Sequence, residues 1–316
     1  MTILVTGGAG FIGSTLVDKL LEKKFEVVCL DDFNDYYNPK FKWQNIEAAL
    51  KNKKFTLFKV DIRNFKKLAE VFEKVKIDKI IHLAARAGVR PSIKNPRLYE
   101  EVNNYGTLNL LELARIHKVP NFIFGSSSSV YGNSKKIPSR EDDRVDTPIS
   151  PYAATKRFGE LMTYTYSHLY GLNCIVLRLF SVYGPRGRSD MAPYIFTKAI
   201  LTSSPITKFG KGDTARDWTY VDDIVDGIIS ALDKKLGYEI INLGNSAPVT
   251  LKQFIATLEK VCGKKAKIVE VPEIQGEVKK TYANIQKAKK LLNWQPKIKF
   301  EEGLKRFVDW FKLANR

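Results

Sequence analysis

A tyrosine and a lysine four residues apart could form a pair that transfers protons. Tyr152 and Lys156 stand in the stretch YAATK, and positions i and i+4 share one face of a helix. A free tyrosine has a pKa of about 10 and is a poor base at neutral pH. A neighbouring ammonium group favours the phenolate, so the pair predicts a base for a hydroxyl proton. Taken alone, the pattern is also typical of ordinary helix surfaces.

Four hydroxyl groups follow the apolar run NFIF, in the stretch GSSSSVYG at residues 125–132. A serine-rich turn needs no function, because serine is frequent where chains turn. Ser127, however, ends the strand expected just before the helix that carries Tyr152. Ligands of doubly wound sheets bind beyond the carboxyl ends of the strands, so these two side chains are predicted to meet in one crevice.

The stretch TGGAGFIG, residues 6–13, follows the first apolar run and has the features of a dinucleotide site. Gly7, Gly10 and Gly13 are spaced as GxxGxxG. Such glycines let the backbone turn tightly and approach a pyrophosphate at the N-terminus of the next helix. The second β-rich run ends in Asp31, and a carboxylate there binds the ribose hydroxyls and repels a 2′-phosphate. The pattern therefore favours NAD over NADP.

Strands and helices alternate through the first half of the chain. Apolar, β-rich runs predict strands at 2–6, 26–30, 55–60, 79–84, 121–125 and 173–180. Amphipathic stretches between them predict helices at 11–23, 65–74, 96–117 and 151–170. Near-continuous apolar strands separated by helices indicate a parallel sheet covered on both faces. The predicted fold class is α/β, a doubly wound parallel (Rossmann) sheet with a smaller α/β substrate domain.

The chain changes character near residue 180. The turn-rich stretch VYGPRGRSDMAP is followed by one more expected strand, at 239–244, and by three helical patterns. We therefore expect an NAD-binding domain from residues 1–180 plus about 220–245. A smaller domain that binds the substrate is expected from residues 181–219 plus 246–316, with a cleft between the two.

The bulk composition limits the possible partners. The 316-residue chain has a net charge of +18, which permits nucleic-acid binding. Its lysines are dispersed, however, and no zinc-finger spacing accompanies them, so an anionic small substrate is expected and no nucleic acid. No apolar run approaches the roughly 20 residues that span a bilayer, so no membrane partner is expected.

The cysteines and the N-terminus indicate a compartment. The three cysteines, Cys29, Cys174 and Cys262, are far apart and odd in number, which predicts reduced thiols and no disulfide framework or metal site. The first residues lack a basic leader and a small-residue cleavage site. A cytoplasmic location is expected. The three histidines are expected to be structural.

In their order along the whole chain, the three glycines, Asp31, SSSSVYG and YAATK resemble the extended short-chain dehydrogenase/reductase family. Within it, they resemble the nucleotide-sugar 4-epimerases, most closely those of UDP-glucuronate. The resemblance implies NAD as a bound catalytic cofactor and a UDP-sugar as substrate. It implies Tyr152 as base, Lys156 as its activator and ribose ligand, and Ser127 as hydrogen-bond partner of the sugar O4. It also implies a homodimer formed through helices 96–117 and 151–170.

The resemblance also implies two sets of binding residues. The cofactor site would comprise Gly7, Gly10, Phe11, Ile12, Gly13, Asp31, Asp32, Asn34, Asp61, Ile62, Leu83, Ala84, Ala85, Asn103, Tyr152 and Lys156. The substrate site would comprise Arg86, Ser127, Ser128, Ser129, Ser181, Arg188, Tyr194, Arg216 and Glu277.

The residues after Ser127 favour epimerisation over related reactions. Related dehydratases carry Asp-Glu, and related decarboxylases a Glu, where this chain has Ser128 and Ser129. Removing water across C5–C6 needs a general acid and a general base, and hydroxyls supply neither well at neutral pH. The expected reaction therefore inverts C4 through a 4-keto sugar and converts UDP-glucuronate to UDP-galacturonate.

Two segments, 31–42 and 180–196, resemble UDP-glucuronate 4-epimerases and supply candidates for a carboxylate site. Of Arg186 and Arg188, we expect Arg188 to bind a carboxylate at C5, with Ser181 assisting, because an arginine fork matches a carboxylate at two points. A diphosphate contact or a surface salt bridge is the alternative for these arginines. Holding the carboxylate charged would also suppress its loss as carbon dioxide.

Three positions of the second domain bear on the nucleotide and the sugar. Arg216 matches an arginine that binds the diphosphate, and Glu277 stands where an aspartate is more usual for the ribose. Thr281 stands where galactose-type epimerases carry tyrosine, which leaves room for a larger substituent.

Two alternative functions stay open. One is a 4-epimerase of UDP-glucose or UDP-N-acetylglucosamine. The other is a non-catalytic NAD-sensing or nucleic-acid-binding protein on the same fold. The intact set of Ser127, Tyr152 and Lys156 weighs against the second alternative, since a sensor does not need them.

Overall fold

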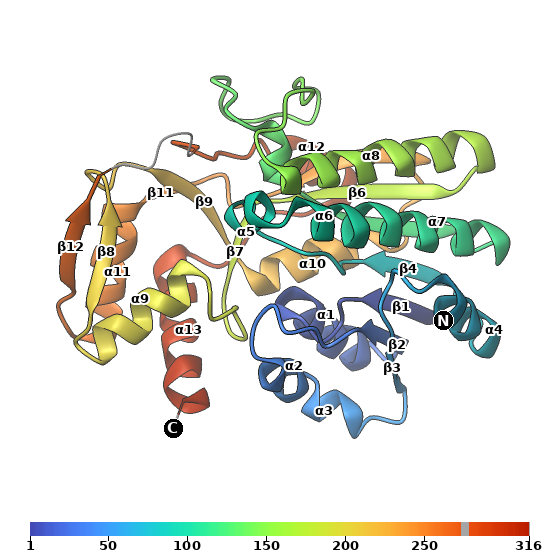
Figure 1. Cartoon of the computed structure of the whole chain (residues 1–316), viewed down its shortest axis with the longest axis horizontal. Coiled ribbons are helices and arrows are strands. Elements are labelled where there is room, and N and C mark those ends of the chain that lie inside the picture. The colour runs from blue at the N-terminus through green and yellow to red at the C-terminus, as the bar shows by residue number, and fades with distance from the viewer. Residues whose placement is uncertain (273–277, 316) are drawn as a thin grey trace.

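A parallel sheet of seven strands runs through the computed structural model, which describes residues 1–272 and 278–315 (Figure 1). The sheet order is β10-β6-β5-β4-β1-β2-β3. Its strands are β1 (Thr2–Thr6), β2 (Glu26–Asp31), β3 (Phe55–Lys59), β4 (Lys79–His82), β5 (Asn121–Ser127), β6 (Asn173–Leu179) and β10 (Tyr238–Leu243). The chain winds outward from β1 through β2 to β3, and in the other direction from β4 to β6. The predicted doubly wound fold is confirmed, and the change of direction between β1 and β4 creates a ligand crevice at the carboxyl ends.

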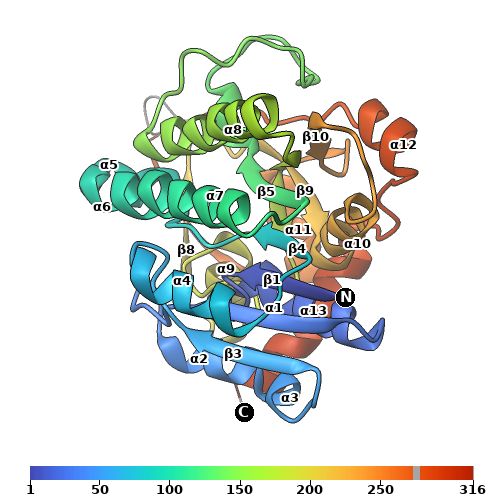
Figure 2. The same ribbon diagram turned by 90° about the vertical axis from the view of Figure 1, so that its right-hand side faces the viewer.

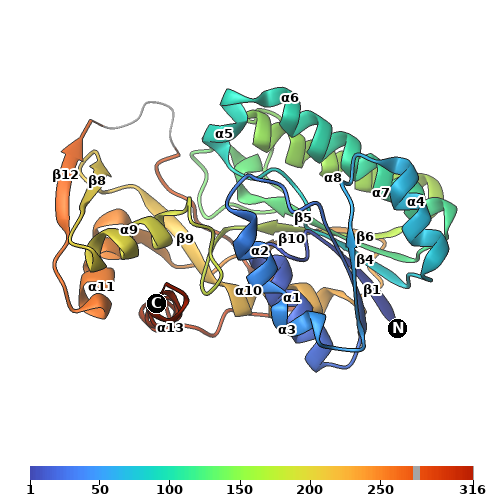
Figure 3. The same cartoon turned by 60° about the horizontal axis from the view of Figure 1, so that its bottom comes forward.

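Helices cover both faces of this sheet, as the apolar strands require (Figure 3). On one face lie α4 (Phe65–Lys74), α7 (Gly106–Ile116) and α8 (Pro151–Tyr170), and on the other lie α1 (Phe11–Glu22), α3 (Glu47–Leu50) and α10 (Val221–Ala231). Successive strand residues point to opposite faces. Ile3 and Val5 therefore join one apolar cluster with Leu16 of α1, while Leu4 joins a second cluster with Leu68 of α4. These two clusters form the core on either side of the sheet.

The helix expected at 96–117 consists of three consecutive pieces (Figure 2). They are α6 (Pro96–Tyr99), a π-helical turn (Glu100–Tyr105) and α7, and α5 (Val89–Lys94) precedes them. The π-helical turn holds Asn103, whose Nδ2 donates to the Arg86 carbonyl at 3.0 Å and whose Oδ1 accepts from the Arg86 amide at 2.8 Å. Bonds to a distant loop therefore accompany the local departure from α-helical geometry.

The later part of the chain builds a smaller body beyond the carboxyl ends of the central strands (Figure 1). A three-stranded sheet contains β7 (Ser181–Tyr183), β9 (Ala215–Tyr220) and β11 (Pro248–Thr250), and a parallel pair contains β8 (Pro205–Phe209) and β12 (Lys267–Val271). Its helices are α9 (Ala192–Leu201), α11 (Leu251–Cys262) and α13 (Phe300–Ala314), whereas α2 (Pro39–Asn45) packs on α1 and α3, and α12 (Gln286–Leu292) packs on β10 and α10. Phe254 of α11 packs between Trp218 and Phe300, with ring centroids 5.2 and 5.7 Å away. Aromatic contacts therefore stabilise this body.

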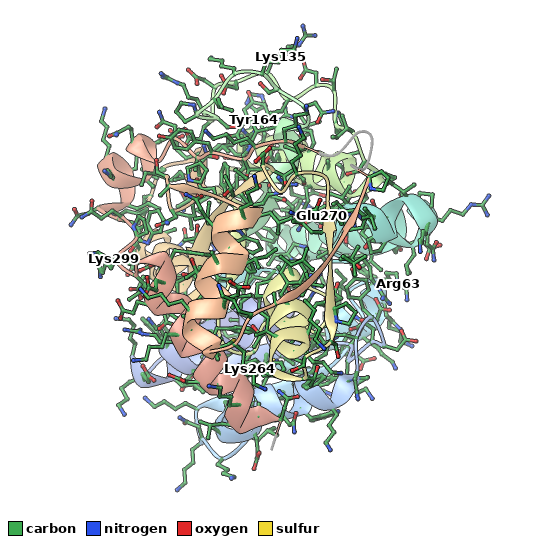
Figure 4. All side chains as sticks on the ribbon, turned by 90° about the vertical axis from the view of Figure 1, so that its left-hand side faces the viewer. Arg63, Lys135, Tyr164, Lys264, Glu270 and Lys299 are labelled. Atoms are coloured by element: carbon green, nitrogen blue, oxygen red, sulfur yellow. The ribbon has the colours of Figure 1, made fainter. Side chains whose placement is uncertain are left out.

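The excess positive charge is spread over the surface. Figure 4 shows Lys135 and Lys299 projecting from different edges of the molecule. The side chains of Lys136, Lys260 and Lys297 are also largely exposed. Within the described residues, no helix combines the length and apolar character needed to cross a membrane.

Candidate active site

A cavity of about 630 Å³ lies at the carboxyl ends of β1, β2, β4 and β5 and extends to the smaller body. Of the residues proposed from the sequence, it is lined by Gly7, Gly10, Phe11, Ile12, Gly13, Asp31, Asp32, Asn34, Ile62, Leu83, Ala84, Ala85, Arg86, Ser127, Ser128, Ser129, Tyr152, Lys156, Ser181, Arg188 and Arg216. The fold therefore brings the glycine loop, the serine run, the Tyr–Lys pair and three candidate substrate arginines, Arg86, Arg188 and Arg216, to one place.

Two residues proposed for the cofactor site do not line this cavity. The carboxylate of Asp61 is paired with Arg63, whose Nη2 lies 2.7 Å from Oδ2. Asn103 is buried behind the cavity, where it holds the main chain of Arg86 and donates to Thr155 Oγ1 at 2.9 Å. Asn103 is thus placed to shape the loop after β4 through its backbone.

One residue proposed for the substrate site, Tyr194, also lies away from this cavity. Tyr194 faces the core between α9 and α13, where its ring packs against Phe311 at 4.8 Å and its hydroxyl donates to Asn315 Oδ1. The burial of its ring explains why it does not reach the cavity. Glu277 lies outside the described residues.

The glycine loop has the shape that a dinucleotide phosphate requires. A Cβ at Gly13 would lie 2.1 Å from the Gly7 carbonyl oxygen, and a Cβ at Gly7 would lie 2.8 Å from the Ala84 amide nitrogen. Gly7 also has a φ of +69°. Gly10, the N-cap of α1, contributes no side-chain cap, so the first amides of this 12-residue helix are available to an anion in the cavity. The residues present fit a pyrophosphate.

Asp31 is held in place at the end of β2. Its carboxylate accepts from the amides of Ala9 at 3.2 Å and Phe33 at 2.9 Å, and from Lys42 Nζ at 3.2 Å. Burial raises the pKa of Asp31, and the Lys42 ammonium acts in the opposite direction. The carboxylate therefore has a fixed position at the cavity wall, where the ribose of a dinucleotide is expected.

The serine run divides its hydroxyls among different partners. Ser126 is buried and donates to Glu160 Oε1 at 2.6 Å. Ser127 Oγ accepts from the Ser129 amide at 3.1 Å, and Ser127 lowers the pKa of Tyr152. Ser128–Tyr131 form a 3₁₀ turn, and Ser128, Ser129 and Tyr131 of this turn line the cavity. Within the described part of the chain, the buried Ser129 Oγ has no hydrogen-bond partner, so it remains available to a ligand.

The Tyr–Lys pair lies on the first turns of α8, against β5. Burial raises the pKa of Tyr152, while Ser127 and the Arg188 guanidinium lower it. Lys156 Nζ donates to the Gly125 carbonyl at 2.7 Å, and burial lowers the pKa of this ammonium to about 8. The net direction for Tyr152 differs from the lowering that helical spacing suggested, because burying a phenolate opposes its ionisation. Arg188 is a cation that stabilises the phenolate in this arrangement.

The structure separates the two candidate arginines of the 180–196 segment. Arg186 has a φ of +64° and pairs with Asp18 of α1 at 2.7 Å, away from the main cavity. Arg188 lines the cavity and pairs with Asp190 through Nε and Nη2, each at 2.9 Å. Of the two, Arg188 is therefore the cation positioned to meet a ligand.

Several lining residues were not identified from the sequence. They include Tyr36, Tyr37, Lys42, Arg90 and Lys280, while Thr281 lines the cavity as its position suggested. The tyrosine pair in NDYYN, within an otherwise polar loop, was the signal for the first two. No local pattern distinguishes Lys280 from its neighbour Lys279, because only the path of the chain brings one of them to the cavity.

Comparison with known proteins places the chain in a defined family. Residues 4–307 match the family described as GDP-mannose 4,6 dehydratase. The chain is 49% identical over 310 residues to a protein of Thermodesulfobacterium geofontis named UDP-glucuronate 4-epimerase, covering 98% of this chain and 95% of that protein.

Two solved structures share the fold over the whole chain. One is UDP-glucuronic acid 4-epimerase from Bacillus cereus in complex with UDP-glucuronic acid and NAD, with a TM-score of 0.92, 37% identity and coverage of 99% of this chain and 100% of that one. The other is UDP-glucose 4-epimerase from Thermotoga maritima with UDP-glucose, with a TM-score of 0.93, 33% identity and full coverage of both chains. The neighbours thus include enzymes named for an acidic sugar and for a neutral sugar.

Proposed function

The chain belongs to the family described as GDP-mannose 4,6 dehydratase, within the extended short-chain dehydrogenase/reductases, and we propose that it is an NAD-dependent 4-epimerase converting UDP-glucuronate to UDP-galacturonate. The observation that carries the proposal is the convergence of Ser127, Tyr152, Lys156 and Arg188 on the cavity that contains the dinucleotide loop. Ser128 stands where a dehydratase requires an acidic residue, so the family description does not fix the reaction.

The residues that would hold NAD are those of the glycine loop, Asp31 and Lys156. The amides at the start of α1 receive the pyrophosphate, and the Asp31 carboxylate accepts from ribose hydroxyls. Bound at these residues, NAD would supply a reversible hydride acceptor for C4 of the sugar. The negative charge of the Asp31 carboxylate repels the 2′-phosphate of NADP, so the site favours NAD over NADP.

Proton transfer belongs to Tyr152. Its phenolate takes the proton of the sugar 4-hydroxyl as C4 is oxidised, and the phenol returns that proton when C4 is reduced on its other face. Ser127, which lines the same cavity as Tyr152 and lowers its pKa, donates to O4 and keeps it within reach of the phenol. Lys156, fixed by the Gly125 carbonyl, orients the cofactor ribose and adds positive charge near the phenol.

Recognition of the acidic sugar belongs to Arg188 and the serine run. The guanidinium of Arg188 and the hydroxyls of Ser129 and Ser181 line the same cavity. A carboxylate at C5 supplies the anion and the acceptors that these groups match. Held as a charged, hydrogen-bonded group, the carboxylate of the 4-keto sugar resists loss as carbon dioxide.

A 4-epimerase of UDP-glucose or UDP-N-acetylglucosamine is the second candidate. Thr281 in the cavity wall is compatible with the UDP-N-acetylglucosamine enzyme, because a small side chain leaves room for a larger C2 substituent, and it counts against a strict UDP-glucose enzyme. UDP-glucuronate is favoured because a neutral sugar gives the Arg188 cation no counter-charge.

Incubation of the purified protein with UDP-glucuronate, followed by proton NMR, tests the proposal. We expect UDP-galacturonate to accumulate to an equilibrium mixture, without release of carbon dioxide, and Tyr152→Phe to abolish the conversion. A UDP-pentose product would identify a decarboxylase and overturn the proposal. Conversion of UDP-glucose or UDP-N-acetylglucosamine, with UDP-glucuronate unchanged, would retain the epimerase and reject the acidic substrate.

A homodimer is proposed from an apolar surface on α8 and the π-helical turn. Tyr105, Leu161, Tyr164 and Leu169 are each 49–60% exposed, and exposed apolar side chains of this size are typical of interfaces. Leu161→Glu should shift the protein toward monomer in sedimentation velocity. The matched change Leu313→Glu, at an exposed leucine of α13, should not. Equal behaviour of the two variants would contradict the proposed interface.

A cytoplasmic location is proposed from the cysteines. Cys29, Cys174 and Cys262 are free thiols, and unpaired thiols are typical of reducing compartments. The nucleotide sugars of the proposed reaction also carry two charged phosphates, which prevent them from crossing a membrane and so keep them in the compartment where they are made. Fractionation of cells that express the protein tests this location.

A further inference from the structure

Tyr36 stands where three loops meet in the cavity. Its ring centroid lies 5.7 Å from Cζ of Arg86, which follows β4, and 5.2 Å from Cζ of Arg188, which follows β7. All three residues line the cavity. One aromatic ring therefore contacts two guanidinium groups that come from separate parts of the sequence, a cation–π arrangement that the helices and strands alone do not produce.

The hydroxyl of Tyr36 is anchored to the loop that follows β4. It donates to the Ala87 carbonyl at 2.6 Å, and the Tyr99 hydroxyl donates to the same carbonyl at 2.7 Å. Gly88, with a φ of +106°, leaves the space for this contact, since a Cβ there would lie 2.9 Å from the Tyr36 hydroxyl oxygen. The Tyr36 amide donates to Asn34 Oδ1 at 3.1 Å. Backbone and side chain together give the ring a fixed orientation.

Arg188 is constrained on one edge and on one face. Its Nε and Nη2 pair with Asp190, which leaves Nη1 outside that ion pair. The Arg188 side chain is 20% exposed and Asp190 is 40% exposed, so the cation is the more enclosed partner. A planar guanidinium held at one edge and against one ring has a defined direction for its remaining donors. Arg188 also lowers the pKa of Tyr152, so it lies electrostatically close to the reacting group.

We propose that Tyr36 is a positioning residue that fixes the plane of the Arg188 guanidinium and so gives the site its preference for a sugar carboxylate. This inference rests on the proposed function, because the carboxylate is that of UDP-glucuronate. Without the ring, the plane of the Arg188 guanidinium is free to rotate about the edge that is paired with Asp190, and the carboxylate loses a preorganised partner. Tyr36 is assigned no contact with the uridine or the diphosphate, so the binding of UDP itself is expected to stay unchanged.

The test compares Tyr36→Leu, Tyr36→Phe and a matched control in the NAD-loaded protein. Tyr170→Leu is the control, because Tyr170 also lies under a guanidinium, with Arg115 Cζ at 5.3 Å, but does not line the cavity. Titration calorimetry on a Tyr152→Phe background, which prevents turnover, gives the Kd values of UDP-glucuronate, UDP-glucose and UDP. UDP-glucose differs from UDP-glucuronate only by a hydroxymethyl group in place of the carboxylate.

We expect Tyr36→Leu to weaken UDP-glucuronate binding about tenfold, as loss of an enclosed cation–π contact predicts, with UDP-glucose and UDP almost unchanged. Tyr36→Phe keeps the ring and should retain most of the preference, and Tyr170→Leu should retain all of it. In the active enzyme, Tyr36→Leu should raise KM for UDP-glucuronate and leave kcat nearly unchanged.

Two results would overturn the inference while leaving the proposed function intact. One is equal weakening of all three ligands by Tyr36→Leu, which would indicate a general distortion of the cavity. The other is an unchanged Kd for UDP-glucuronate. A different result would count against the proposed function itself. If the protein with unmodified Tyr36 binds UDP-glucose as tightly as UDP-glucuronate, the proposal of an acidic substrate is rejected without any Tyr36 variant.

Discussion

Replacing Arg188 with alanine removes the cation assigned to the sugar carboxylate and leaves the catalytic residues in place. Arg188 contacts Asp190 through two hydrogen bonds and lies over the Tyr36 ring. Asp190 is the more exposed member of the ion pair, so its carboxylate stays solvated after the change. The variant therefore tests recognition with little expected cost to folding.

The size of the effect follows from the contact that is lost. A hydrogen bond to a charged group contributes about 1.5–3 kcal/mol, and each 1.4 kcal/mol corresponds to about tenfold in rate or affinity. We therefore expect Arg188→Ala to lower kcat/KM for UDP-glucuronate by roughly 10- to 150-fold. Activity on a neutral UDP-sugar should fall far less, because no carboxylate contact is lost.

The pH dependence of kcat/KM in Arg188→Ala provides a second, independent test. Arg188 lowers the pKa of Tyr152, so its removal raises that pKa. A base with a higher pKa is deprotonated only at higher pH, and the acidic limb of the kcat/KM profile should move upward. Arg188→Lys keeps the positive charge but loses the two-pronged guanidinium. Compared with Arg188→Ala, it should restore the acidic limb of the kcat/KM profile more fully than the affinity for UDP-glucuronate.

The assay is initial-rate epimerisation of UDP-glucuronate and UDP-glucose over a range of pH, with product resolved by chromatography. The reasoning would be refuted by an equal loss on both sugars, or by an Arg188→Ala enzyme as active on UDP-glucuronate as the parent. Arg188 would then serve the diphosphate or the surface.

Two further predictions concern Lys156 and a buried ion pair. Burial lowers the pKa of Lys156 to about 8, so kcat/KM of the parent enzyme should decline as the pH rises through 8. Lys156→Arg stays cationic and should not show this decline. If the variant declines in the same way, the titrating group is not Lys156. Arg178 holds Glu160 by two hydrogen bonds of 2.8 Å in the core, and breaking such a pair costs about 3–5 kcal/mol. Arg178→Met should lose that much unfolding free energy in urea, whereas Arg140→Met, at an exposed pair with Asp142, should lose about 1 kcal/mol or less. Equal losses would show that burial is not the cause.

Local sequence patterns predict the bounds of those strands and helices whose own residues determine where they begin and end. The strand at 2–6 and the helices at 65–74 and 151–170 have the predicted bounds, because each combines a buried apolar run with its own period or cap. Ser150 caps the last of these helices by accepting from the Ala153 amide at 3.1 Å. The strand expected to stop at 125 continues to Ser127, since pairing with β6 outweighs the low β-propensity of serine.

Features set by distant contacts could not be predicted in this way. The π-helical turn at 100–105 accompanies bonds from Asn103 to Arg86, a residue on another loop. Tyr36 reaches the cavity only because the loops after β2, β4 and β7 pack together. Tyr194 shows the converse, because a tyrosine on an apolar helix can face either the cavity or the core. Direction and burial decide such cases, and both come from the tertiary structure.

The most direct test of the central claim is the fate of the C4 hydrogen during turnover. The account predicts that UDP-glucuronate deuterated at C4, incubated with the protein in ordinary water, yields UDP-galacturonate that retains the deuterium at C4, because the hydride leaves and returns within one cavity. UDP-galacturonate carrying solvent hydrogen at C4 would contradict the account, since C4 would then have lost a proton to a base in place of a hydride to NAD.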